Sequence, residues 1–408
     1  MQGKFAALCA EPIISAPPPG NLPPEGLLRE DNLVAWLQRF VRHPSEQSKL
    51  YEMDPEIARF IRECTTPLLR EIGASYRYDK MGNLIVEVGP KSEQSLLFVA
   101  YAMTHPGAKM PDPFSATMIE TARGLAIRGR GVAEQKTALA ALFGALAETL
   151  RKPHISGRLT VVLLTAGETG RHDAIESVMP ELECRPRFAV VCIGTDNRIA
   201  VGNKGRIDFD VIVKGKASHS SAPWHGVNAI TGAQRLLQLM DGFKLGVPDH
   251  PHFGPATLTP TAIDSAPKAT HTVPDTVQIT FDRRLLPGED PQVAYNAIRK
   301  AITIEKPWAV ECRLGPVMYP NEISKDGPLM TKLHAAFVDA GQPSPEHFYC
   351  NFALDAGYLA RLGVEAVMLG PGEVDQFHSN EENVLISDLT KMGNVYYRII
   401  EQCLAPKS

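Results

Sequence analysis

The sequence lacks the features that mark a membrane-spanning or nucleic-acid-binding protein. No apolar run reaches the roughly 20 residues that a transmembrane helix needs, and the longest one, residues 95–103, has the length of a buried strand. Basic residues are in slight deficit, with 42 Lys and Arg against 46 Asp and Glu and a formal net charge of −4. Such a chain has no electrostatic footprint for nucleic acid. We therefore expect no membrane partner and no nucleic-acid partner.

The sequence also lacks a cysteine pattern for disulfides or metal. Its seven cysteines are scattered without CxxC spacing, and their odd number favours free thiols in a reducing compartment. Residues 5–10 are apolar but too short for the core of a signal peptide, and proline-rich sequence follows them. These absences predict a cytoplasmic location, with Cys192 and Cys350 as small core residues.

What is present is a long alternation of strands and helices. A proline-rich lead-in covers residues 1–30, and the strongest helical pattern covers residues 134–150. The strands between the helices are unbroken apolar runs, which is typical of strands buried on both faces. This pattern predicts a largely parallel sheet flanked by helices. The predicted strands are 83–89, 95–103, 159–167 and 188–194.

The pattern changes after residue 205. Residues 207–213 alternate between apolar and polar, and the predicted elements over 206–314 are strand, helix, strand, strand, helix and strand. We expect this segment to be an inserted α+β domain with a small sheet that has one open face. The predicted fold is α/β with a mixed, largely parallel sheet, formed by residues 31–205 and 315–408.

Four groups of short motifs stand in one order along the chain. They are Asp112-Pro113-Phe114 with Gly129-Arg130-Gly131 and Lys136; Gly215-Lys216 with His219, Pro223 and Gly226-Val227-Asn228-Ala229; Val273-Pro274-Asp275 with Asp282, Arg284 and Pro287-Gly288; and Gly370-Pro371-Gly372 with His378 and Glu381 or Glu382. In this order and spacing, the chain after residue 30 resembles the family of acetylornithine deacetylase, succinyl-diaminopimelate desuccinylase, zinc aminoacylase and carboxypeptidase G2. The resemblance implies a zinc-exopeptidase-like fold whose inserted domain is a lid and dimerisation domain.

The resemblance implies two zinc ions held by His and carboxylate side chains, but this chain has only part of that set. Tyr101 and Met103 stand where the family has its HxD ligands, and Ile193 stands where it has a further acidic ligand. Glu134 replaces the family's bridging Asp, and His378 is retained. Two zinc ions in the usual arrangement are therefore not expected.

Of the family's paired glutamates only Glu168 is present, and the resemblance implies that it is the general base. A relocated site for one metal is a hypothesis. Strand alternation puts His105 on the face of the lost ligands, so His105, Glu134 and His378 could join Glu168 as nitrogen and oxygen donors. The alternative for His105 is a local hydrogen bond. We expect one divalent cation, Zn²⁺ or Mn²⁺, or no metal.

Further site residues are expected from the inserted domain and elsewhere. The resemblance implies that His219 polarises the scissile carbonyl in the active site of a partner subunit, which predicts a homodimer; the alternative is a turn histidine. Arg284 either binds a substrate carboxylate or forms a salt bridge. His271 stands where relatives have an Asn that contacts substrate. Tyr101 either fills the space of a lost ligand or donates to the oxyanion. Gly357 either lines the pocket or begins a helix.

These residues predict a hydrolase of a C–N bond in a small, carboxylate-bearing amide, with an atypical one-metal or metal-independent site and Glu168 as general base. Two alternatives stay open. One is a non-catalytic relative that binds a small molecule or regulates a partner, which the lost ligands favour. The other is an enzyme of altered chemistry on the same scaffold, such as a deaminase or an acyl transferase. The intact lid motif favours an enzyme.

Overall fold

The computed structural model describes residues 26–47, 54–152, 155–167 and 170–406. Glu168 and most of the proline-rich lead-in lie outside these residues. The chain divides into two compact units, the first formed by Met1–Gly202, Glu322–Phe348 and Tyr358–Ser408, and the second by Asn203–Asn321 and Tyr349–Gly357. The expected domain boundaries stay a prediction.

The first unit is built on a mixed, mainly parallel sheet with the strand order β1-β2-β6-β3-β7-β17-β8. The four central strands β6, β3, β7 and β17 pair in parallel, whereas β2 and β8 pair antiparallel with them. Strands β3, β6 and β7 are buried along their whole length, as their apolar runs predict. The bounds are β1 (Arg77–Tyr78), β2 (Leu84–Val88), β3 (Ser95–Tyr101), β6 (Arg158–Leu164), β7 (Phe188–Cys192), β8 (Ile199–Asn203) and β17 (Glu365–Leu369).

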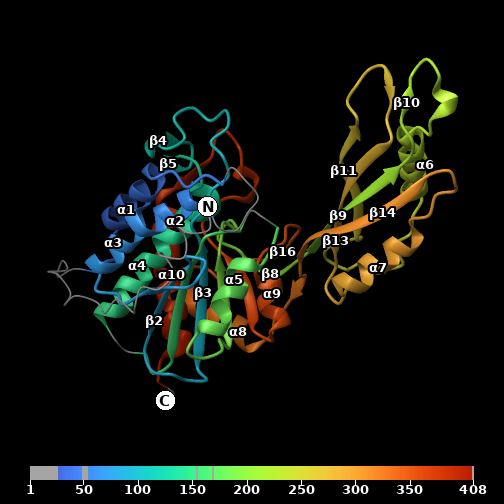
Figure 1. Ribbon diagram of the computed structural model, residues 1–408. Helices are drawn as coiled ribbons and strands as arrows, with labels where there is room; N and C mark the ends of the chain where they lie inside the picture. The colour runs from blue at the N-terminus through green and yellow to red at the C-terminus, as the bar shows by residue number, and fades with distance from the viewer. Residues whose placement is uncertain (1–25, 48–53, 153–154, 168–169, 407–408) are drawn as a thin grey trace. The chain divides into compact units, whose positions relative to one another are not determined.

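Helix α4 is the central helix of this unit. Its sequence is Ala and Leu on all sides, and Thr137 to Thr149 are all buried, which is typical of a helix covered by neighbours around its circumference. It packs against α1 and α10 and lies beside the sheet (Figure 1). The helices of the unit are α1 (Glu30–Arg42), α2 (Pro55–Phe60), α3 (Thr66–Glu71), α4 (Thr137–Arg151), α5 (Asp173–Val178), α8 (Pro328–Asp339) and α10 (Ile386–Leu404). Helix α9 (Ala356–Arg361) begins with two residues of the second unit and ends in the first.

Short π and 3-10 turns connect several of these helices. The π turns are η2 (Ile61–Thr65) and η3 (Val132–Lys136), and the 3-10 turns of this unit are η4 (Met179–Glu181) and η6 (Val374–Gln376). A separate small antiparallel sheet has the order β18-β5-β4, with β4 (Thr117–Thr121), β5 (Gly124–Arg128) and β18 (Asn383–Leu385). Strands β15 (Asn321–Glu322) and β16 (His347–Cys350) lie where the chain passes from one unit to the other.

The second unit is an antiparallel sheet with the strand order β11-β13-β9-β14. Alternate residues of β9, from Ile207 to Val213, are buried in one core with α6 and α7. The elements follow the expected order of strand, helix, strand, strand, helix and strand, which confirms the predicted α/β fold with its α+β insertion. Their bounds are β9 (Gly205–Lys214), β10 (Ser218–His219), η5 (Pro223–His225), α6 (Ala229–Asp241), β11 (Thr257–Ala266), β12 (Thr272–Val273), β13 (Thr276–Leu285), α7 (Pro291–Ala301) and β14 (Ala309–Met318).

The described residues also bear on the predicted absences. None of their helices is long and apolar enough to cross a membrane. Six cysteines in the described residues are free thiols. Cys192 and Cys350 are buried, and burial raises the pKa of the Cys350 thiol to about 12, so both are inert core residues rather than nucleophiles.

Candidate functional site

The parallel strands β3, β6, β7 and β17 end at one edge of the sheet, which is where open α/β sheets bind their ligands. Tyr101 is the last residue of β3 at this edge and Met103 follows the strand; they are 1% and 2% exposed. Their side chains converge on Gly167: a β-carbon there would lie 2.7 Å from the Tyr101 ring and 2.9 Å from the Met103 methyl carbon. Glu168, the expected general base, is the next residue and lies outside the described part of the chain.

Three of the expected site residues come together at this edge. The rings of His105 and His378 are stacked, with centroids 4.0 Å apart and an angle of 17° between their planes. Nε2 of His378 lies 3.3 Å from Oε2 of Glu134, whose side chain is 9% exposed. His378 itself has a left-handed backbone conformation, with φ of 60°, so its ring projects from a tight turn. The resulting group can bind a cation or orient a polar substrate.

The stacking limits what these histidines can hold. A ring nitrogen binds a metal ion that lies in the plane of its ring. Because His105 and His378 lie in nearly parallel, offset planes, an ion in the plane of one ring is out of the plane of the other. Among the described residues, no group of three or more His, Cys, Asp or Glu side chains is arranged to hold a metal ion. The expected metal role of His105, Glu134 and His378 stays a prediction, because Glu168 is not among those residues.

The backbone around Glu134 is held by a carboxylate far along the chain. Glu382 accepts hydrogen bonds from the backbone N–H groups of Gly131 (3.0 Å) and Ala133 (2.9 Å), and it pairs with Arg130 at 3.0 Å with both side chains 1% exposed. Burial raises the pKa of Glu382, while those two N–H groups and Arg130 act in the opposite direction. The sequence motif fits Glu381 and Glu382 equally well. In the structure, Glu382 is the residue whose carboxylate holds the backbone before Glu134.

Two glycines let the loops of the site approach η3. A β-carbon on Gly372 would lie 1.7 Å from the carbonyl oxygen of Ala133, and one on Gly194 would lie 2.2 Å from it. The N–H of Gly194 donates to the carbonyl of Glu134 at 2.8 Å. The glycines are therefore required by close backbone contact.

Two residues of the loop that follows β7 have structural roles. Ile193 is 2% exposed and belongs to the hydrophobic core. Asp196, acidic but out of register for the family's ligand, accepts a hydrogen bond from the N–H of Val374 at 2.9 Å and pairs with Arg198. Its carboxylate therefore fastens two loops together.

The expected site residues of the second unit lie in two separate places, with His219 near His271 and Arg284 on β13. His219 is exposed, and its Nδ1 lies 2.7 Å from the Ser221 hydroxyl; its ring centroid is 6.0 Å from that of His271. Arg284 makes a two-pronged contact with Asp282 at 2.9 and 3.0 Å, so a carboxylate of the chain already occupies its fork.

Gly357 has a packing explanation. A β-carbon there would lie 1.8 Å from the carbonyl oxygen of Tyr319, a residue of the same unit. The residue also lies at the start of α9 (Ala356–Arg361). The roles predicted for His219, His271, Arg284 and Gly357 in substrate binding or catalysis remain predictions.

Sequence and structure comparisons place the chain among known hydrolases. Residues 201–310 match the family described as the peptidase dimerisation domain. The acetylornithine deacetylase of Myxococcus xanthus is 30% identical over 284 residues, which are 66% of this chain and 71% of that protein. The succinyl-diaminopimelate desuccinylase of Phenylobacterium zucineum is 25% identical over 350 residues, covering 81% of this chain and 88% of that one.

A solved structure has the same fold. The M20 family metallo-carboxypeptidase of Sulfolobus solfataricus aligns with a TM-score of 0.73 at 17% identity, covering 91% of this chain and 99% of that one. The family expected from the motifs and the expected class of C–N hydrolase are thus confirmed. The chain belongs to the M20 peptidase family of amide-bond hydrolases.

Proposed function

We propose that this protein hydrolyses a small, carboxylate-bearing amide at an atypical site that holds at most one divalent metal ion and uses Glu168 as general base. The observation that carries the proposal is the set of side chains at the carboxyl edge of the sheet. His378 and Glu134 are paired there, and Tyr101 and Met103, which stand where the motif resemblance puts the family's HxD ligands, are buried beside Gly167. The charged and hydrogen-bonding groups needed for hydrolysis persist, but the donors for a metal pair do not.

Two zinc ions do not fit these side chains. Zinc prefers His nitrogen, Cys sulfur and carboxylate oxygen, usually four donors to an ion. Met103 offers a soft thioether, Ile193 offers no donor, and Tyr101 packs its ring against Gly167. The proposed reaction therefore has no step at a zinc pair.

A single divalent cation fits better. Glu134 and His378 supply one oxygen and one nitrogen donor that lie 3.3 Å apart, and Glu168 would add a second carboxylate. Such an ion would polarise the amide carbonyl as a Lewis acid. Without it, the same pair would orient the substrate, because Glu134 fixes the ring of His378 through their contact.

The remaining residues have roles that do not depend on the metal. Glu168 would take a proton from the attacking water and return it to the leaving nitrogen. In the homodimer, His219 would donate a hydrogen bond to the oxyanion that develops in the partner subunit's site. Tyr101 would be a second donor in the site of its own subunit. Arg284 would exchange part of its contact with Asp282 for the substrate carboxylate. His271, whose ring lies 6.0 Å from that of His219, would contact the substrate beside that histidine.

Metal content and activity together test this proposal. Elemental analysis of the purified protein should give one metal ion per chain or none, and a value of two zinc ions would contradict the proposal. Glu168→Gln should lower kcat for a panel of N-acyl amino acids and dipeptides by at least roughly 100-fold. The control is Glu176→Gln, on α5, which should leave kcat unchanged. No hydrolysis of any panel member by the native protein would favour the non-catalytic alternative.

We also propose that the protein is a homodimer joined through its second unit. Strand β11 is one of the two edge strands of that sheet, and most of its side chains are exposed, including Ile263 at 61%. An edge strand of this length carries a row of free backbone groups that a second copy can pair with. The match to the peptidase dimerisation domain supports the same arrangement.

A further inference from the structure

A serine and two histidines of the first unit are joined in one hydrogen-bonded row. The Oγ atom of Ser344 lies 2.7 Å from Nδ1 of His334, which stands on α8. On the other side of the same ring, Nε2 of His334 lies 2.8 Å from Nε2 of His347. The row shares no residue with the candidate hydrolase site. A nucleophile, a base and a third group that orients the base are the parts of a catalytic triad.

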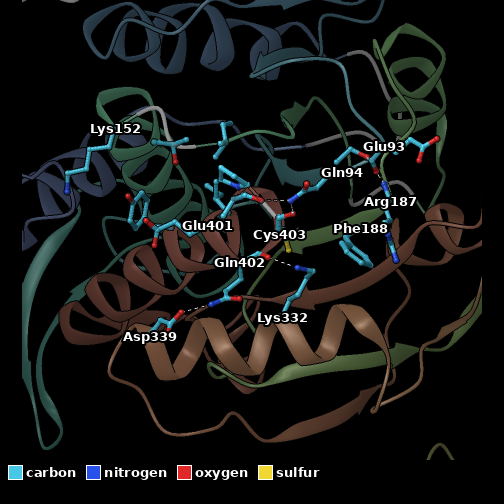
Figure 2. Close-up of a pocket in the computed structure, with 17 residues that line it drawn as sticks. Glu93, Gln94, Lys152, Arg187, Phe188, Lys332, Asp339, Glu401, Gln402 and Cys403 are labelled. Atoms are coloured by element: carbon cyan, nitrogen blue, oxygen red, sulfur yellow. Dashed lines mark hydrogen bonds between the residues drawn. The ribbon is translucent and has the colours of Figure 1, made fainter. Parts of the chain in front are cut away.

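The helix that carries His334 is fixed in place. Lys332 of α8 donates to the carbonyl of Gln402 at 2.5 Å, and Asp339 of α8 accepts a hydrogen bond from the Gln402 amide at 2.6 Å. Figure 2 shows both contacts as dashed lines between α8 and the end of α10. His334 is two residues after Lys332, which is rather more than half a turn, so it leaves α8 on a different side. The position of its ring is therefore set by a helix that is fastened elsewhere.

The segment that carries Ser344 is stiff. Pro343 and Pro345 stand on either side of the serine, and a proline ring fixes its own φ near about −65° and restricts the residue before it. The carbonyl of Glu346 accepts a hydrogen bond from the N–H of Ile199 at 2.9 Å, which ties the segment to β8. The serine hydroxyl is thus held beside its base.

The positions of the protons in the row follow from the partners. Burial, together with the neighbouring His334, lowers the pKa of His347. His347 therefore stays neutral, and its Nε2 can accept a hydrogen bond from Nε2–H of His334. Nδ1 of His334 then carries the lone pair that accepts the proton of the Ser344 hydroxyl. This is the tautomer in which a histidine acts as general base on a serine.

Ser344 also lines a cavity of about 430 Å³, a volume that suits a small molecule. Phe337 of α8, Met392 and Val395 of α10 and the two prolines beside Ser344 give the cavity an apolar wall. Gln342 contributes an amide group to the lining, and an amide N–H is a suitable donor to an oxyanion.

The charged side chains of the lining favour a substrate without net charge. Two of them are acidic and two are basic: Asp196, Glu346, Arg198 and Lys391. Arg198 pairs with Asp196, and Lys391 pairs with Asp388 at 3.2 Å. An ester suits the row better than an amide, because an alcohol is the better leaving group and the row has no carboxylate to stabilise the protonated base.

We propose that Ser344, His334 and His347 form a second catalytic site, which hydrolyses small neutral carboxylic esters through an acyl-enzyme. Oγ of Ser344 attacks the ester carbonyl carbon while its proton passes to Nδ1 of His334. The bond to the alcohol oxygen then breaks, and that proton moves to the leaving alcohol. Water attacks the acyl carbon and passes a proton to His334, which returns it to Oγ of Ser344 as the acid is released. The proposal does not rest on the hydrolase function.

A fluorophosphonate, which reacts with activated serines, tests the nucleophile. Peptide mass spectrometry of the treated full chain should place the phosphonyl group on Ser344. The matched comparison is Ser221, whose hydroxyl also lies 2.7 Å from a histidine Nδ1, that of His219. That nitrogen already accepts the backbone N–H of Ser221 at 3.2 Å, so Ser221 should stay unlabelled. No label on Ser344, or equal labelling of the two serines, would overturn the proposal.

Hydrolysis of p-nitrophenyl butyrate measures turnover. Ser344→Ala and His334→Gln should each lower kcat by at least roughly 100-fold, while thermal unfolding checks that both variants are folded. The control is Ser115→Ala, at an exposed serine whose hydroxyl bonds to Asp112 and Thr117, and it should leave kcat unchanged. Turnover that survives Ser344→Ala would contradict the proposal.

His347 is a positioning residue, and a change of its acceptor group tests that role. His347→Ala should lower kcat by at least roughly tenfold, whereas His347→Glu should restore it, because a carboxylate also accepts a hydrogen bond from Nε2 of His334. A carboxylate stabilises the protonated form of the neighbouring ring, so the acidic limb of the pH–rate profile should move to higher pH in His347→Glu. Equal kcat values and identical profiles in the two variants would exclude this role.

The hydrolase site must be excluded as the place of ester cleavage. Glu168→Gln and His378→Ala should leave the hydrolysis of p-nitrophenyl butyrate unchanged. If either variant abolishes it while Ser344→Ala does not, the ester is cleaved at the hydrolase site and the proposal fails. Loss of amide hydrolysis in Glu168→Gln without loss of ester hydrolysis separates the two proposals.

Discussion

Arg130 and Glu382 are two buried charged side chains, and each is tolerated in the core only while the other neutralises it. Glu382 also receives two backbone N–H groups of the segment that leads to Glu134. A buried charge that loses its partner is strongly destabilising, by about 3 to 5 kcal/mol. The pair therefore links the stability of the fold to the geometry of the site.

We predict that Glu382→Ala lowers the free energy of unfolding by about 3 kcal/mol or more, because Arg130 would stay buried without a carboxylate. Urea unfolding at neutral pH measures the change. The neighbouring Glu381→Ala is the control, since that side chain is 82% exposed and should matter little. Equal effects of the two substitutions would contradict the role assigned to Glu382.

Lys136 gives a prediction about pH. Its Nζ donates to the carbonyls of Phe40 (2.8 Å) and His43 (3.0 Å) at the end of α1, and burial lowers its pKa to about 7. The unfolded chain keeps this proton until about pH 10.4. Between these values the unfolded state binds more protons, so stability rises with pH, by at most about 5 kcal/mol in total.

The Lys136→Met variant has no titrating group at this position. Its free energy of unfolding is therefore the reference for that of the native chain. The stability of the native chain relative to Lys136→Met should increase as pH rises from about 7 to about 10, and should level off below pH 7, where both states hold the proton. Urea unfolding over this range measures the difference. A difference that is constant with pH would show that the ammonium keeps its charge when buried.

At the scale of elements, the helical segment 55–71 contains a π turn. The sequence predicts a single helix over residues 55–72, but Pro67 has no N–H for the helix and its ring displaces the preceding turn. The structure responds with η2 between α2 and α3. The hydroxyls of Thr65 and Thr66 both donate to the carbonyl of Ile61, at 2.7 and 2.9 Å. These hydrogen bonds stabilise the widened turn.

A second π turn, η3, places Glu134, and Gly372 packs against it. We predict that Gly372→Ala destabilises the protein by at least about 2 kcal/mol and lowers activity, because a β-carbon there would meet the Ala133 carbonyl at 1.7 Å. Thermal unfolding and hydrolysis rates test this. Gly242→Ala is the control, because nothing lies within 4 Å of a β-carbon at that position. A Gly372→Ala variant as stable and active as the native chain would mean that the loop can move away.

At the scale of the whole molecule, the dimer can be broken at one strand. Ile263→Lys places a charge on the exposed edge of β11, where it should oppose pairing with a second copy. Light scattering should give twice the chain mass of 44.6 kDa for the native protein and a monomer for the variant. Val293→Lys, on α7 and 68% exposed, should remain a dimer. A native monomer would remove the role of His219 in a partner's site.

The α/β fold could be predicted because its central strands are unbroken apolar runs. The insertion could be predicted because residues 207–213 alternate between apolar and polar. The small sheet of β4, β5 and β18 could not, since most residues of β4 are exposed or half-buried and carry no period-two pattern. Motifs brought Glu134 and His378 into one hypothesis and strand alternation added His105; the structure places His378 in contact with both. Their stacking could not be foreseen, because it depends on the left-handed turn at His378.

The link between Arg130 and Glu382 has a consequence for synthesis of the chain. The two residues are 252 positions apart. At a translation rate of about 5 to 20 residues per second, Glu382 follows Arg130 by roughly 13 to 50 s. During that time the segment that bears Glu134 lacks the carboxylate that fixes it. The nascent chain therefore has no assembled site until Glu382 has been synthesised.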